Sequence, residues 1–399
     1  MTTVANHRAA LTQMLGSVEA IDLALGDALG AVAAADITSP SAYPAVPLAA
    51  TDGYAIASND ALAAVSLPVA FDVDSRERTP RVLVRGTAVR IASGAPLPRG
   101  ADAVAALADT DAGVGTVRLS RSILRGENVR GAGFDADQGE VIVPAGRRIG
   151  PRELGLVAAT GRSRVTVRPV PRVVVAAIGS ELVDARSGEP GVPEANTHML
   201  SALVEDAGAK AYRVSAIPDD PAAIAAALED QVVRADVIIT TGGLSGGTTD
   251  PLVEVLGAIG TSERVDLNLL PRARHAVGRI AEGNTPVIAL PGHPVSALLA
   301  FEAYVRPALR AMSGFAEVRR VTIRAQWARD WPSTSGFMEA VPVSLDLDDD
   351  GVVRAAPLSD GRGGVSLGAL ARSDGIAWVG ADVTTARAGD EVRCTVWDR

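Results

Sequence analysis

VIITTGGLSGGTTD, residues 237–250, joins a run of strand-forming residues to a glycine-rich turn and then to an acid. The apolar run predicts a strand that is buried on both faces, as in a parallel sheet. The turn matches neither GxGxxG nor GxxxxGK[ST], so the sequence favours neither a dinucleotide site nor a P-loop. A glycine turn that opens a helix exposes unpaired N–H groups, which favours binding of an anion such as phosphate. A tight turn without a ligand is the alternative.

Strand and helix patterns alternate on either side of this turn, from residue 172 to about residue 313. Because each strand run is apolar throughout, we expect a doubly wound α/β domain whose parallel sheet is covered by helices on both faces. Ligands of such sheets bind beyond the carboxyl ends of the strands. The strand runs lie at 172–179, 211–217, 237–241 and 285–292, and the helical patterns at 196–208, 220–233 and 295–312.

Two other parts of the chain carry short strand-like runs separated by Gly, Pro and Asp. Residues 56 to about 145 predict a β module, and the chain from Val321 onward predicts a small β-barrel. Residues 11–34 have apolar residues at three- and four-residue spacing and predict a helix, and residues 151–160 predict a short one. The predicted fold class is therefore multidomain, α/β plus all-β modules.

Composition narrows the class of protein. The 399 residues are too many for one core, and the net charge of -9 comes with no basic block, so we expect no nucleic-acid partner. Cys394 is the single cysteine, which excludes an internal disulfide and favours a reduced, cytoplasmic protein. No apolar run reaches the roughly 20 residues of a membrane span, so we expect no membrane insertion.

Acidic residues follow the predicted strands at the edge where ligands bind. Glu181 comes just after the first strand, Asp219 and Asp220 precede a helix, and Asp250 opens the helix after the glycine turn. Carboxylates beside a phosphate are the usual ligands of Mg²⁺. For Asp220 and Asp250 a helix N-cap is the alternative.

Several long segments together resemble the MoeA family, the molybdopterin molybdenumtransferases, which are related to the gephyrin E domain. The resemblance runs from about residue 7 to the end of the chain. It is carried by VPLAATDGYAI (46–56), RIASGAPLPRGADAV (90–104), TTGGLSGGTTD (240–250) and LPGHPVSA (290–297), in the family's order.

The resemblance implies an elongated subunit that forms a homodimer. Its parts would be an extended dimerisation arm (1–45 with 135–168), a β module (46–134), a molybdopterin-binding α/β domain (169–317) and a C-terminal β-barrel (318–399). The implied activity is the Mg²⁺-dependent insertion of molybdate into adenylylated molybdopterin (molybdopterin-AMP), with release of AMP. The site would be shared between the α/β domain of one subunit and the β module of the other.

The same resemblance assigns site residues by position. The catalytic residues would be Asp52, Ser93, Glu181, Asp219 (or Asp220) and Asp250, with Glu181 and Asp250 as metal ligands. The cofactor-binding residues would be Gly242, Gly243, Ser245, Pro291 and Pro294.

The chain departs from the family pattern where the family binds oxyanions. Two family lysines align to Leu270 and Ala273, and a family serine aligns to Gly364. Arg272 and Arg274 bring positive charge nearby, but Arg presents a planar fork where Lys presents a point charge. This divergent site leaves an alternative function, a catalytically eroded, gephyrin-like dimeric scaffold that binds cytoskeletal or membrane-receptor proteins.

Overall fold

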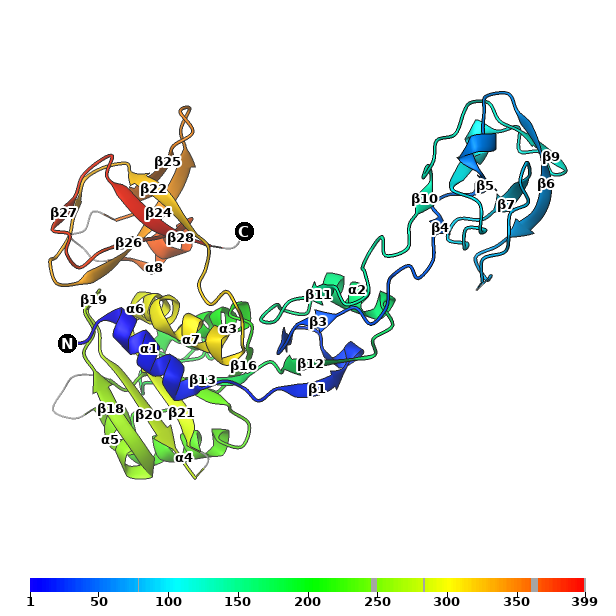
Figure 1. Ribbon diagram of the computed structural model, residues 1–399. Helices are drawn as coiled ribbons and strands as arrows, with labels where there is room; N and C mark the ends of the chain where they lie inside the picture. Colours follow the sequence, from blue (N-terminus) through cyan, green and yellow to red (C-terminus); the bar gives the residue numbers. More distant parts are fainter. Residues whose placement is uncertain (78, 245–249, 283, 360–364, 398–399) are drawn as a thin grey trace.

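The computed structural model describes residues 1–77, 79–244, 250–282, 284–359 and 365–397. The chain is elongated (Figure 1). An α/β domain and a C-terminal β-barrel lie together at one end, a β module lies at the other end, and a narrow arm joins them. In the described residues, no helix has the length and apolar character that a membrane span requires.

The α/β domain is built on a six-stranded sheet in the order β16-β13-β17-β21-β20-β18. The first four strands are those predicted from the sequence and are parallel, whereas β20 and β18, which the sequence analysis did not predict, are antiparallel to their neighbours. β18 follows helix α5 directly, and the connection from β18 back to β20, residues 266–274, contains the short strand β19. The strands are β13 (Arg172–Ile178), β16 (Lys210–Arg213), β17 (Val237–Gly242), β18 (Gly260–Val265), β20 (His275–Ile280) and β21 (Thr285–Leu290).

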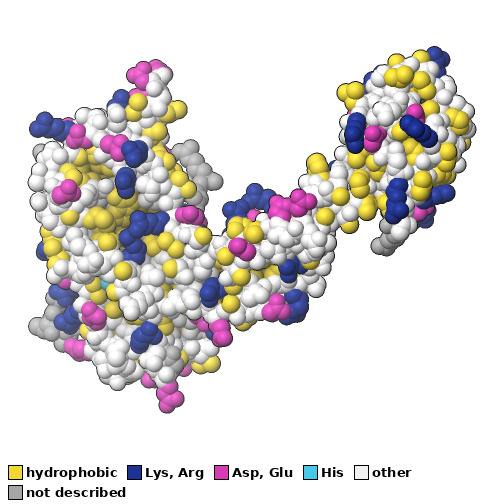
Figure 2. Space-filling model, in the orientation of Figure 1, with side chains coloured by type: hydrophobic (Ala, Val, Ile, Leu, Met, Phe, Trp, Pro, Cys, Tyr) yellow, Lys and Arg dark blue, Asp and Glu magenta, His cyan; other side chains and the backbone are white. Residues whose placement is uncertain are grey.

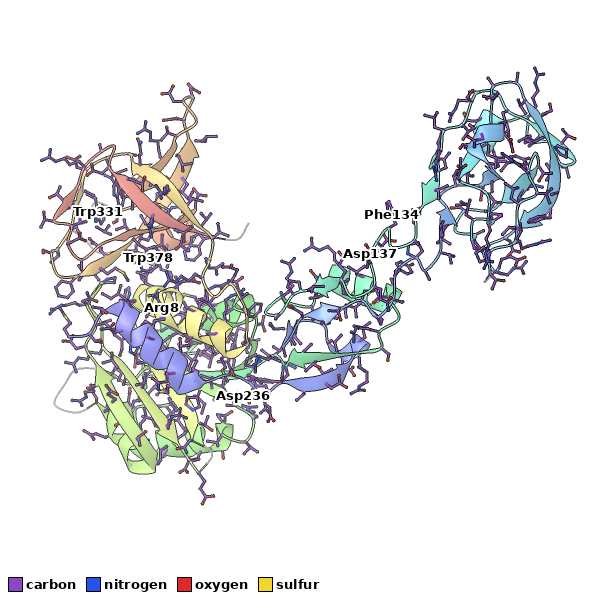
Figure 3. The ribbon with its side chains drawn as sticks, in the orientation of Figure 1. Arg8, Phe134, Asp137, Asp236, Trp331 and Trp378 are labelled. Carbon is purple, nitrogen blue, oxygen red and sulfur yellow. The ribbon has the colours of Figure 1, made fainter. Side chains whose placement is uncertain are left out.

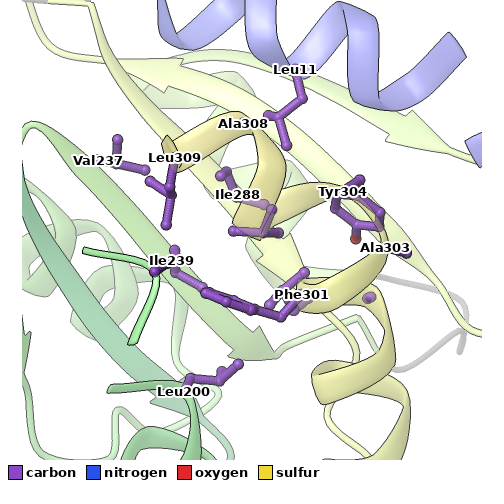
Figure 4. Packing of buried hydrophobic residues seen from close by; sticks show 14 of the residues in the cluster. Leu11, Leu200, Val237, Ile239, Ile288, Phe301, Ala303, Tyr304, Ala308 and Leu309 are labelled. Carbon is purple, nitrogen blue, oxygen red and sulfur yellow. The ribbon is translucent and has the colours of Figure 1, made fainter. Parts of the chain in front are cut away.

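Helices cover both faces of this sheet, as predicted. Val237 and Ile239 of β17 belong to one core with α1, α3 and the α6–η4–α7 helix, while Ile238 belongs to the opposite core with α4 and α5. Figure 4 shows the first core, in which Phe301 packs between the sheet and its helices. The helices are α1 (Val4–Leu15), α3 (Asn196–Asp206), α4 (Pro221–Gln231), α5 (Pro251–Ile259), α6 (Pro294–Ala300), the π-helical turn η4 (Phe301–Val305) and α7 (Arg306–Met312).

The N-terminal segment corrects the prediction of one long helix over 11–34. Helix α1 ends at Leu15, because Gly16 adopts a positive φ of 65°. The chain then enters β1, which pairs with β12 more than 140 residues further along the sequence. The arm contains β1 (Ile21–Ala24), η1 (Leu25–Asp27), β2 (Val32–Ala33), β3 (Ile37–Thr38), β11 (Val141–Val143), α2 (Pro151–Ala159) and β12 (Arg164–Arg168).

The two remaining parts are β structures. The β module is a five-stranded sheet in the order β8-β5-β7-β6-β9, and the C-terminal strands close into a barrel through the pairing of β24 with β26. The short strand β19 joins the α/β domain to this barrel by pairing with β24. The module contains β4 (Leu48–Ala49), β5 (Gly53–Ile56), η2 (Ser58–Asp60), β6 (Ser66–Val73), β7 (Ala88–Ile91), β8 (Ala103–Ala106), η3 (Leu107–Asp109), β9 (Thr116–Arg118) and β10 (Val129–Arg130). The remaining elements are β14 (Leu182–Val183), β15 (Val192–Pro193), β19 (Leu269–Leu270), β22 (Thr322–Trp327), β23 (Trp331–Pro332), β24 (Met338–Leu347), β25 (Val353–Pro357), α8 (Leu367–Ala371), β26 (Gly375–Val379), β27 (Thr385–Ala386) and β28 (Glu391–Val396).

Candidate functional site

The parallel strands β13, β17 and β21 end side by side at one edge of the sheet, the edge at which sheets of this kind bind ligands, and we refer to it as the crevice. Asn196, at the start of α3, ties two of these ends together: its Nδ2 donates to Thr241 Oγ1 at 2.9 Å and to the Gly292 carbonyl at 2.7 Å. Thr241 Oγ1 in turn donates to the Pro291 carbonyl at 2.7 Å. This network fixes the loop after β21 against the end of β17. Sequence reasoning missed both residues: Thr241 stands in the quoted TTGG motif but was taken only as part of the strand, and Asn196 stands in none of the motifs.

The two glycines at the end of β17 have a packing reason as well as a candidate binding role. Gly242 has φ 87°, and a Cβ there would lie 2.1 Å from the carbonyl oxygen of Ile178. Gly243 has φ 68°, and a Cβ there would lie 3.1 Å from the Leu252 side chain. The backbone of the turn therefore lies directly against β13 and α5. Ser245, the predicted hydroxyl donor of this turn, lies outside the described residues.

Two acids at this edge, Glu181 after β13 and Asp219 before α4, are exposed. Ser180 donates its N–H to Asp219 Oδ2 at 2.9 Å, and Asp219 donates its N–H to Ser180 Oγ at 2.9 Å, so the two loops clasp each other. Glu181 and Asp219 are both exposed, and the described residues provide neither with a cationic partner. Asp220 instead caps α4, with Oδ2 accepting from the Ala223 N–H at 2.8 Å. Of the two sequence alternatives, Asp219 is thus the open acid and Asp220 the N-cap.

Asp250 has a different environment from the other acids. It occupies the N-cap position of α5, yet its side chain makes no capping hydrogen bond. Its carboxylate is 3% exposed and is held by two arginines, with Arg264 Nη2 at 3.1 Å and Arg274 Nη1 at 3.3 Å. The two arginines are about half exposed, so their guanidinium groups also face solvent at the crevice edge. Sequence reasoning found Arg274 but missed Arg264.

The segment that replaces the family lysines joins the α/β domain to the barrel. Leu270 lies in β19, opposite Glu339 of β24. The Arg272 guanidinium lies 4.4 Å from the centroid of the Phe337 ring, in a cation–π contact with the barrel side. Positive charge at this edge therefore comes from arginines rather than from positions 270 and 273. Gly364 lies outside the described residues.

Asp52 and Ser93 lie together, but in the β module. Asp52 Oδ1 accepts the Ser93 N–H at 2.7 Å, and Ser93 Oγ donates to the Ala50 carbonyl at 3.2 Å. Both residues are exposed. The β module, which carries both residues, lies at the opposite end of the elongated molecule from the crevice (Figure 1). A single chain therefore does not bring Asp52 and Ser93 to Glu181 and Asp219.

Pro291 and Pro294 border the crevice on the β21 side, where Pro294 opens helix α6. Asn196 Oδ1 is buried there and has no hydrogen-bond donor within the described part of the chain. A buried acceptor of this kind is costly to leave unpaired, and it suits a ligand that offers an N–H group.

The α/β domain and its crevice define the class of protein first, because residues 174–311 match the model of a probable molybdopterin binding domain. Residues 2–161 match the MoeA N-terminal region (domain I and II), and residues 324–397 match the MoeA C-terminal region (domain IV). The chain belongs to the MoeA family, as the resemblance of its motifs predicted.

Relatives and solved structures agree over the whole length. Molybdopterin molybdenumtransferase 2 of Mycobacterium tuberculosis is 33% identical, with 100% of both chains covered. Molybdopterin molybdenumtransferase 1 of the same organism is 32% identical over 98% of both chains. The crystal structure of a molybdopterin biosynthesis MoeA protein from Pyrococcus horikosii has a TM-score of 0.78 and 26% identity, with 99% of both chains covered. The predicted multidomain fold class is thereby confirmed.

Proposed function

We propose that this chain is a molybdopterin molybdenumtransferase of molybdenum cofactor biosynthesis, which inserts molybdate into adenylylated molybdopterin and releases AMP. The observation that carries the proposal is the crevice at the ends of β13, β17 and β21, with its open carboxylates, in a chain that matches MoeA models along nearly its whole length. The single, buried cysteine fits action in the cytoplasm.

The crevice offers complementary groups to a pterin. Pro294 and the Gly242-Gly243 backbone lie at this edge with the buried Pro291, and Asn196 Oδ1 offers a buried acceptor for a ring N–H. We assign the phosphate to the side of the glycine turn, where helix α5 begins, because a helix N-terminus favours negative charge.

Arg264 and Arg274 supply the positive charge that positions 270 and 273 lack. Asp250 holds both guanidinium groups, and about half of each arginine side chain is exposed on the side from which an oxyanion would approach. Asp250 is therefore proposed as a positioning residue for these arginines. Its pairing with two cations competes with the predicted role as a metal ligand.

Glu181 and Asp219 fit Mg²⁺ better than Asp250 does, because they are exposed and have no cationic partner in the described ranges. Mg²⁺ commonly takes one or two carboxylates together with substrate phosphate oxygens and water. The described residues contain no group of three or more His, Cys, Asp or Glu that could hold a metal by themselves. We therefore propose that Mg²⁺ joins these carboxylates together with the substrate phosphate, where it would neutralise charge on the leaving group.

The separation of Asp52 and Ser93 from Glu181 leads us to propose a homodimer with shared sites. A site within one chain would require the β module to cross the length of the molecule (Figure 1). A second copy could instead place its β module over the crevice. The gephyrin-like scaffold alternative has no support from the relatives named above, which are molybdenumtransferases.

The test is a turnover assay with the purified chain, adenylylated molybdopterin and molybdate, in which released AMP is measured. We expect AMP release that requires molybdate, stops on chelation of Mg²⁺ and is lost in Glu181→Ala. Absence of AMP release at enzyme concentrations equal to that of the substrate would refute the transferase function.

Subunit mixing tests the shared site separately. Asp52→Ala and Glu181→Ala should each be inactive, but a mixture should recover roughly a quarter of the wild-type rate, because half of the random dimers are mixed and each has one intact site of two. A mixture of Asp52→Ala with Ser93→Ala is the matched control and should stay inactive, because both changes fall in the same module. Equal recovery in both mixtures, or none in either, would contradict a shared site.

A further inference from the structure

A second cavity lies away from the crevice, between the α/β domain and the barrel. It has a volume of about 570 Å³ and is lined by α1, by the η4–α7 helix and by the barrel strands β22, β26 and β28. Figure 2 shows an apolar patch at this junction with basic side chains beside it. None of the predicted site residues lines this junction pocket. Its volume is typical of a site for a small molecule.

The lining of the junction pocket is strongly basic. It contains one acid, Glu302, and six arginines: Arg8, Arg306, Arg319, Arg320, Arg324 and Arg393. Such an excess of one charge in a recessed site concentrates counter-ions of the opposite sign. The pocket therefore attracts anions, although the whole chain carries a net charge of -9.

The deepest of these arginines are already paired with acids. Arg320 Nε donates to Glu302 Oε2 at 3.0 Å, and Arg306 Nη1 donates to Asp206 Oδ2 at 2.7 Å. Arg306 is 4% exposed, and its Nε–H has no acceptor in the described ranges. This buried layer holds the wall of the pocket in place and is not itself the binding group.

Arg8, Arg319 and Arg393 form a second, unbalanced group at the mouth of the pocket. None of the three has an ion pair or a side-chain hydrogen bond with the part of the chain that the structure describes. Burial and, next, the charge of Arg319 lower the pKa of Arg8, so these two cations repel each other. An anion bound between them would remove that repulsion and would receive charge-assisted hydrogen bonds.

The remaining lining is apolar and contains one aromatic ring. Trp378 is half-buried, and its Nε1 donates to Thr395 Oγ1 at 2.8 Å, which fixes the orientation of the indole. Met338 and Ile323 lie on the barrel side with it, and Val4 lies on α1. In Figure 3, Arg8 on α1 and Trp378 on the barrel face each other across the junction. The pocket thus combines a fixed planar surface with free guanidinium groups.

We propose that the junction pocket binds a small phosphate ester with a planar ring, whose phosphate lies between Arg8, Arg319 and Arg393 and whose ring packs on Trp378. The site is distinct from the crevice, and its ligand bridges α1 and the barrel. Binding there would add a contact between two parts of the chain that also meet through the short strand β19, the buried ion pairs of Arg320 and an apolar cluster of α6 with the barrel.

Calorimetric titration of the full chain at constant ionic strength tests this site, with phenyl phosphate as the probe. Phenyl phosphate should bind more tightly than inorganic phosphate, and phenol should show no binding at the same concentrations. Arg319→Gln should weaken binding about tenfold, the factor expected for one lost charge-assisted hydrogen bond. Arg319 is exposed, so this change leaves the fold intact.

Two variants locate the binding. Arg164→Gln, which removes an exposed arginine of the arm, should leave the affinity unchanged. Glu181→Ala in the crevice should leave it unchanged as well, which separates this pocket from the proposed active site. Absence of binding at millimolar phenyl phosphate, equal affinity for inorganic phosphate, or loss of affinity in Glu181→Ala but not in Arg319→Gln would each overturn the proposal.

Discussion

Acid should loosen the contact between α1 and the α/β domain, because two histidines are buried there on either side of Tyr304. His275 Nδ1 lies 2.7 Å from Tyr304 Oη, and the His7 ring meets the Tyr304 ring edge-on at a centroid distance of 4.6 Å. The two histidines are 6% (His7) and 4% (His275) exposed. Burial lowers the pKa of each from 6.5 to about 4, so both are neutral in the folded chain at pH 7.

The number of protons bound by the folded and unfolded chains determines whether stability rises or falls with pH. Because the folded-state pKa lies below the unfolded-state pKa, the unfolded chain binds more protons in acid. The stability that neutral His7 allows is fully present above pH 6.5, and it is lost as the pH falls through that value toward 4. The two pKa values give a loss of about 2 kcal/mol between pH 7 and pH 5 from His7 alone. His7→Leu should remove this part of the pH dependence.

Hydrogen exchange of the α1 amides is the suitable assay, since a chain with several domains has no single free energy of unfolding. The wild type should lose protection between pH 7 and pH 5, after correction for intrinsic exchange, and His7→Leu should lose much less. His198→Leu, at an exposed position on α3, is the matched control and should behave as the wild type. Equal losses in the wild type and in His7→Leu would refute the assignment.

Two further predictions concern stability. Gly242→Ala should destabilise the α/β domain by about 1–3 kcal/mol in urea titrations, because its φ of 87° strains a side chain whose Cβ would lie 2.1 Å from a carbonyl oxygen. Gly155→Ala, in open space on α2, is its control and should be neutral or stabilising, and a stable Gly242→Ala protein would contradict the packing argument. Glu302→Gln should cost about 3 kcal/mol, because it leaves the charge of Arg320 buried with one partner fewer. Arg76→Gln, at an exposed pair, should leave the unfolding curve unchanged, and similar curves for both variants would show that the buried pair does not stabilise the fold.

Local patterns in the sequence predicted the elements whose structure depends on local residues. The apolar run of β17 and the Asp220-Pro221 start of α4 could be predicted because burial on both faces and helix capping leave a continuous local signature. Residues 11–34 could not, because β1 is a strand only through its partner β12. The spacing of apolar residues within 11–34 contains no information about β12, which lies far along the chain.

The environment of Asp250 shows the same limit at the level of a site. From the sequence, Asp250 was predicted to be a metal ligand or a helix N-cap. Both predictions considered only Asp250 and the helix that it begins. The structure adds the hairpin of β18 and β20, whose register pairs Val265 with His275. In that register Arg264 and Arg274 are diagonal neighbours on one face, which lets both reach the same carboxylate. The register of this hairpin could not be predicted, because the sequence analysis identified neither β18 nor β20 as a strand.

The elongated shape separates the predicted site residues into two groups. The exposed acids Glu181 and Asp219 lie in the α/β domain at one end of the elongated molecule, and Asp52 and Ser93 lie in the β module at the other end (Figure 1). Each group is held by its own loops: Ser180 clasps Asp219, and the Ser93 N–H clasps Asp52. In the proposed dimer, each half of the shared site would therefore be formed before the second copy arrives, and dimerisation would need to order only the surface between them. The proposed oxyanion site follows the same rule. Arg264 and Arg274 are held by Asp250, and a guanidinium that is already held in place would lose less side-chain freedom when an oxyanion binds.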